Sequence, residues 1–216
     1  MSLARRDALG IVLRLGFWLP LLIWLAWVWG WYYADLLLPL YRFVLDAVLS
    51  DFGVVYLGIG LEREYVFKAQ VIAEQMILME GQVLPAGFTV DSTTPMCIAL
   101  IHPIVLAVAA LVWPSLTWRG RVLRLLLSLP FLVLLEALDT PLVLASSIHD
   151  LLSYSVNPEA DTASKLIDWT HVMDGGGRYA LTLAGAFAAA GLHAWLDDYR
   201  KRSATPKNKH NSPVRL

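Results

Sequence analysis

Two acidic residues interrupt a strongly apolar run of the chain. The segment LPFLVLLEALDTPLVLA, from Leu129 to Ala145, contains Glu136 and Asp139. Their spacing of three places both carboxylates on one face of a helix. A charged side chain is costly in lipid, so this face is expected to point toward protein or water. The pair predicts either a proton or ion relay, or a structural pair in which Glu136 is protonated or bound to a neighbouring helix while Asp139 lies at the wet outer rim. Asp139-Thr140-Pro141 predicts that the helix bends or ends there.

A second candidate chemistry centres on Cys97, the only cysteine in the chain, which therefore has no internal disulfide partner. With His102 and Arg178 as partners, its thiol could act as a nucleophile. Five residues of helix would separate Cys97 and His102 by about 140° around the axis, which is poor geometry for sharing a proton. Cys97 also has apolar neighbours, and cysteine often serves as a small buried hydrophobe. A structural thiol is therefore favoured over a catalytic one.

The remaining histidines give no recognisable cofactor pattern. His149 and His171 have acidic neighbours in the sequence, namely Asp150, Asp168 and Asp174. No pair has the close HxH or HxxxH spacing of many metal sites, so neither a metal nor another cofactor is predicted. A haem between His102 and His193 is disfavoured because these residues are expected near opposite faces of the membrane.

The composition indicates a membrane protein, with 57% hydrophobic and 16% charged residues and a mean hydropathy of +0.58. Four stretches are long enough to cross about 30 Å of hydrocarbon as helices. They are residues 9–31, 96–113, 122–145 and 179–196. Basic residues gather before the first stretch, between the second and third, and after the fourth, so both termini are expected in the cytoplasm. The predicted fold class is an all-α transmembrane bundle of about four spans.

The segment 32–95 is expected outside the cytoplasm and has two parts. YADLLLPLYRFVLDAVLSDFG has helical spacing of apolar residues and predicts an interfacial helix, or an extension of the first span broken at Pro39. EREYVFKAQVIAE alternates with a period of two, and GQVLPAGFTVDSTTP supplies another extended run, so a β-hairpin module is predicted. Its inner face would carry Tyr65, Phe67, Ala69 and Val71. A module this small must rest on the membrane surface, the interfacial helix or another protein.

The last predicted span is rich in small residues, which let helix backbones approach closely in membranes. The helix-packing candidates are Ala184, Gly185, Ala188, Ala189 and Gly191. The preceding DGGGR, Asp174 to Arg178, predicts a flexible entry into this span. The predicted organisation is 1–31 with the first span, 32–95 outside, 96–196 with three spans and an outer loop at 146–178, and a disordered basic tail at 197–216. The tail is read as an orientation signal, and no nucleic-acid partner is predicted.

One anchor, an outer segment ending in GFTVDSTTP (Gly87 to Pro95) and three further spans together resemble the small integral-membrane proteins associated with exosortases, the bacterial protein-sorting transpeptidases. The resemblance is one of architecture and implies the bacterial cytoplasmic (inner) membrane and a larger integral membrane partner. Exosortases themselves have an outward cysteine, then an arginine, then a histidine. Cys97 and Arg178 could match the first two, but the later histidines, His193 and His210, are expected on the inner side, so no catalytic assignment transfers.

Three function classes follow. The leading one is a non-enzymatic accessory or scaffold subunit that docks a membrane partner or exported substrate at the outer face. The second is a membrane thiol transpeptidase or peptidase that uses Cys97. The third is a proton- or ion-coupled subunit that uses Glu136 and Asp139.

Overall fold

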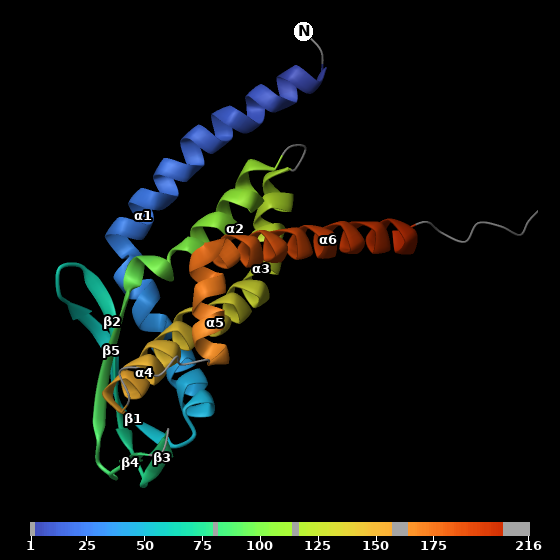
Figure 1. Ribbon diagram of the computed structural model, residues 1–216. Helices are drawn as coiled ribbons and strands as arrows, with labels where there is room; N and C mark the ends of the chain where they lie inside the picture. The colour runs from blue at the N-terminus through green and yellow to red at the C-terminus, as the bar shows by residue number, and fades with distance from the viewer. Residues whose placement is uncertain (1–2, 80–81, 114–116, 157–163, 205–216) are drawn as a thin grey trace, which may run out of the picture.

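The computed structural model describes residues 3–79, 82–113, 117–156 and 164–204. Within them the chain is mostly helical, with five short strands between the first and second helices (Figure 1). The helices are α1 (Leu3–Val48), α2 (Ile101–Val112), α3 (Trp118–Leu138), α4 (Thr140–Val156), α5 (Lys165–Val172) and α6 (Arg178–Ala204). The strands are β1 (Phe52–Leu61), β2 (Tyr65–Ala73), β3 (Ile77–Met79), β4 (Gln82–Leu84) and β5 (Thr89–Pro95). Residues 197–204 of the predicted disordered tail belong to α6, so that boundary is wrong, and the rest of the tail lies outside the described residues.

Helix α1 is a single element that corrects the predicted boundary near residue 32. Its 46 residues include Pro20 and Pro39, neither of which ends it, and Figure 1 shows one continuous, bent ribbon. At 1.5 Å per residue the helix is about 69 Å long, more than twice the thickness of a bilayer's hydrocarbon. The predicted interfacial helix is therefore the second half of α1, and the predicted break at Pro39 is wrong.

The outer segment forms a sheet larger than the predicted hairpin. Strands β1, β2 and β5 form an antiparallel sheet in that order, and β3 pairs with β4. Strand β1 was not predicted, because its pairing with β2 shifts register between Val54 and Tyr56. Such an irregularity breaks the alternation of inward and outward side chains by which a strand is recognised in a sequence.

One face of the sheet packs against helices. Phe67, Ala69 and Val71 of β2 are fully buried, as their alternation predicts, whereas Tyr65 is half exposed. They share a core with Leu45 of α1 and with further residues from α1, α4 and the sheet. The module thus rests on helix α1, one of the predicted supports, and also on α4, which was not predicted.

The predicted outer loop at 146–178 contains two helices. The predicted third span stops at Leu138, and after Asp139 the chain begins α4. Helix α5 and a π-helical turn (η2, Met173–Gly177) then lead into α6. In Figure 1, α5 and α6 meet at a sharp corner. The predicted bend at Asp139-Thr140-Pro141 is confirmed.

Two helical stretches among the described residues are long and apolar enough to cross a membrane. They are Ala8–Val48 and Lys165–Ser203, and a shorter apolar helix covers Met96–Val112. The most apolar part of Ala8–Val48 has no residue buried inside the protein. Its exposed side chains include Phe17, Trp24 and Trp27, the last 87% exposed. These helices agree with the membrane character that the composition predicts.

Candidate functional site

The two acids of α3 lie at the centre of a buried polar network. Glu136 and Asp139 are 0% and 1% exposed, so the carboxylate face points to protein, and the alternative that placed Asp139 at a wet rim is wrong. Helix α3 ends at Leu138 because the next residue, Asp139, leaves the helical backbone conformation, with φ −103° and ψ −86°. Pro141 then falls in the first turn of α4, where its missing N–H leaves no hydrogen bond unmade. The end of α3 thereby presents carboxylates to three other helices.

Glu136 binds α3 to α1. The Tyr33 hydroxyl donates to Oε1 at 2.7 Å, and the Tyr41 hydroxyl donates to Oε2 at 2.6 Å. Each carboxylate oxygen thus has its own donor, which offsets the loss of water around a buried acid. The two tyrosines are eight residues apart on α1, so they rise from one broad side of that helix.

Asp139 binds α3 to α2 and α6. Its Oδ2 accepts from Arg178 Nε at 2.5 Å and lies 2.9 Å from His102 Nε2, and its Oδ1 accepts from Arg178 Nη2 at 3.0 Å. A two-pronged arginine–carboxylate pair fixes direction as well as distance. The other ring nitrogen of His102 lies 2.6 Å from the Thr182 hydroxyl, which donates to the Arg178 carbonyl.

The corner before α6 places Arg178 beside Asp139. Gly176 has φ +108°, a conformation that side chains with a Cβ rarely adopt. A Cβ on Gly177 would lie 2.6 Å from the Val172 carbonyl oxygen. The predicted flexible entry is therefore a defined turn that requires glycine. Across this turn, Arg178 Nη2 also lies 3.4 Å from Oδ1 of Asp174. Before the turn, Trp169 Nε1 donates to the Leu138 carbonyl at 2.8 Å and so caps the end of α3.

The structure brings together two of the three catalytic candidates and leaves out the third. His102 and Arg178 meet on Asp139, whereas Cys97 is exposed in a short 3₁₀ turn, η1 (Met96–Ile98), so the interpretation of Cys97 as a buried hydrophobe is wrong. Both nitrogens of His102 are engaged, and the ring is 1% exposed. His102 is therefore not placed to take a proton from the thiol. His193 is buried in the C-terminal half of α6. Its Nδ1 atom lies 3.8 Å from Oδ2 of Asp197, one turn later in the same helix.

The predicted packing residues of α6 divide into two faces. Gly185 and Ala189 point inward; a Cβ on Gly185 would lie 3.2 Å from Leu135 of α3. By contrast, Ala184, Ala188 and Gly191 are exposed. Only the first pair packs within this chain.

A polar cleft of about 730 Å³ lies beside the network, between β5, α4 and α5. Its acidic members are Asp150, Asp168 and Asp174, joined by His171 and by hydroxyls including Thr93 and Ser147. Asp150 and Asp168 have no ion-pair partner in the described part of the chain. No three potential ligands among the described residues are grouped closely enough to hold a metal ion, and His149 does not line this cleft.

Sequence reasoning found the acids of the network but missed Tyr33, Tyr41 and Thr182. The signal available was polar hydroxyls on otherwise apolar helices, which is too common to single out three positions. Comparison of the chain with protein-family models, curated proteins and solved structures finds no match. The function must therefore be inferred from the geometry of the chain itself.

Proposed function

We propose that this chain is a non-enzymatic, multi-pass subunit of the bacterial cytoplasmic membrane that docks a basic polypeptide segment in its outer cleft. The segment belongs to a larger membrane protein or to an exported substrate. The observation that carries this proposal is the cleft between β5, α4 and α5, in which Asp150 and Asp168 have no ion-pair partner among the described residues. Unpaired carboxylates in a concave surface attract cationic side chains and discriminate against anionic ones.

The membrane placement is supported by α1 and by the charge pattern. The first half of α1 exposes large apolar side chains, and its length carries the second half beyond the hydrocarbon to the sheet. Four spans with both termini inside would put the sheet, α4, α5 and the cleft outside. The start of α3, with Arg119 and Arg121, would then face the cytoplasm, as the positive-inside rule requires.

The buried network supports a scaffold more than a catalyst. Every carboxylate oxygen of Glu136 and Asp139 has a donor or histidine partner from another helix. A relay needs groups that exchange partners, whereas these contacts hold α1, α2, α3 and α6 in one arrangement beneath the sheet. A rigid support is what a docking surface requires, because it limits the ordering cost of binding.

The partner class is proposed from architecture. An anchor, an outer sheet that leads through GFTVDSTTP into α2, and further apolar helices resemble the exosortase-associated membrane proteins. On this proposal the larger partner is a sorting transpeptidase of the exosortase kind, and the chain presents substrates to it or stabilises it.

The test is site-specific photo-crosslinking in the native membrane. A photoreactive amino acid at Ser147, inside the cleft, should capture a membrane or exported protein, and the same group at Val55 on β1 should not. Asp150→Asn with Asp168→Asn should abolish capture, because the charge that selects the partner is lost. Glu62→Gln with Glu64→Gln removes the same charge from the exposed β1–β2 turn and should leave capture intact. Equal capture in both double variants would contradict the proposal.

A further inference from the structure

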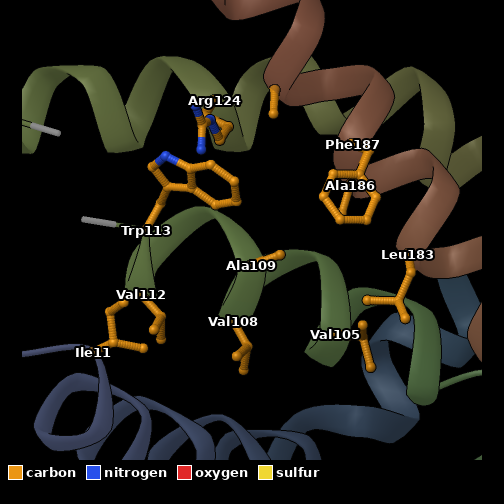
Figure 2. Close-up of a pocket in the computed structure, with 11 residues that line it drawn as sticks. Ile11, Val105, Val108, Ala109, Val112, Trp113, Arg124, Leu183, Ala186 and Phe187 are labelled. Carbon is orange, nitrogen blue, oxygen red and sulfur yellow. The ribbon is translucent and has the colours of Figure 1, made fainter. Parts of the chain in front are cut away.

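An apolar groove of about 470 Å³ lies at the other end of the molecule, between α1, α2 and α6. Its volume falls within the range of about 300–1,000 Å³ of pockets that hold small ligands. The walls are aliphatic and aromatic and include Ile11, Val108, Leu183 and Phe187 (Figure 2). Leu183 and Phe187 are also 48% and 64% exposed, so the groove is continuous with the apolar outer surface of α6.

One charged side chain lines this groove. Arg124 of α3 is 6% exposed, and its Nε and Nη1 atoms are buried with no hydrogen-bond partner among the described residues. Its guanidinium lies 4.9 Å from the centre of the Trp113 ring. Figure 2 shows the Arg124 side chain extending from α3 to the Trp113 ring at one end of the groove. None of the described residues that line the groove is acidic.

A buried guanidinium with two unmade hydrogen bonds favours an anionic acceptor, which matches both its charge and its donors. The Trp113 ring attracts the positive charge of Arg124, but it does not accept hydrogen bonds from the N–H groups at the edge of the guanidinium. Arg124 is six residues into α3, so it lies about 9 Å from the start of the helix, near the depth of lipid headgroups in the proposed membrane placement. Arginine matches phosphate oxygens in a two-pronged geometry.

We propose that this groove binds an anionic phospholipid, with its phosphate on Arg124 and an acyl chain between α1, α2 and α6. A basic pocket between membrane helices on the cytoplasmic side is a recurring site for such lipids. A free phosphate would leave the apolar walls exposed, whereas a lipid fills both parts of the site. The inference rests on the membrane placement of the proposed function but does not depend on the outer cleft.

The test measures lipid retention by the full chain in mild detergent. The chain is titrated with phosphatidylglycerol, with phosphatidylcholine and with inorganic phosphate, and bound lipid is counted by native mass spectrometry. Phosphatidylglycerol should bind in preference to the other two. Arg124→Gln should weaken its binding about tenfold, which is the scale of one charge-assisted hydrogen bond. Arg119→Gln removes an exposed charge from the same end and should have no such effect.

A second variant pair guards against misfolding of Arg124→Gln. Ala186→Leu places bulk in the groove and should displace the lipid, whereas Ala184→Leu on the exposed face of α6 should retain it. Equal binding of both lipids, unchanged by Arg124→Gln and Ala186→Leu, would overturn the proposal, as would recovery of a peptide from the groove. Retained lipid together with failed capture at Ser147 would refute the cleft and leave the lipid site standing.

Discussion

Acidic residues occupy two neighbouring regions of this protein in opposite states. At the end of α3, Glu136 and Asp139 are buried, and each oxygen is matched to a partner. In the cleft, Asp150 and Asp168 have no ion-pair partner among the described residues. A carboxylate taken out of water must be paired and so fixes helices to one another, whereas one at a wet surface remains available to a ligand. Position rather than residue type separates the structural acids from those that we propose to bind a partner.

The largest effect is expected from Asp139→Asn. This change leaves the Arg178 guanidinium buried beside a neutral amide, and breaking a buried ion pair costs about 3–5 kcal/mol. We expect a loss of that order in the free energy of unfolding, measured in mixed micelles. Asp168→Asn in the cleft is the matched control and should stay within about 0.5 kcal/mol of the wild type. Similar losses for both variants would erase the distinction between the two regions.

Removing one tyrosine hydroxyl should have the next largest effect. Tyr41→Phe leaves one oxygen of Glu136 without its donor, which should cost about 1–3 kcal/mol of the same free energy. In a Glu136→Gln background the cost of Tyr41→Phe should change by at least about 0.5 kcal/mol, because the two groups are in contact. A Glu136→Gln variant that folds as well as the wild type but loses function in cells would favour the proton relay instead.

The glycine corner should give an effect of similar size, and the neighbouring glycine provides a matched control. Gly176→Ala forces a Cβ into a backbone with φ +108° and should cost about 1–3 kcal/mol. Gly175→Ala, one residue earlier, meets no atom within 4 Å and should cause no loss of stability. If the corner positions Arg178, the pair between Arg178 and Asp139 should already be weakened in Gly176→Ala. Asp139→Asn should then lower the free energy of unfolding less in the Gly176→Ala background than in the wild type. Equal thermal midpoints for the two alanine variants would show that the turn is not required.

Cys97→Ala should have the smallest effect, within about 0.5 kcal/mol, because the thiol is exposed and has no part in the network. Partner capture at Ser147 should persist in this variant. The single cysteine also reports topology: a membrane-impermeant maleimide should label it in intact cells. Labelling only after the membrane is permeabilised would place the sheet in the cytoplasm and contradict the proposed orientation.

The sequence predicts local features well where one physical signal dominates. The apolar run of α1, the alternation of Phe67, Ala69 and Val71, and the bend at Asp139 each follow from hydrophobic period or backbone chemistry. The missed elements have mixed signals. The register shift at Val54 hides β1, and the apolar run that continues past Pro141 hides the start of α4 as a separate helix.

Taken alone, the sequence determined that Glu136 and Asp139 share a side of α3 and must avoid lipid, because helical spacing and the cost of a bare charge are local properties. Only the tertiary structure decided their partners. Tyr33, Tyr41, His102 and Arg178 come from three other helices, up to 103 residues away along the chain. The same holds for Arg124 and the cleft acids, because which described side chains lie near them depends on how the helices fold. Pairing across such distances is set by how the helices pack, and no spacing within one helix encodes it.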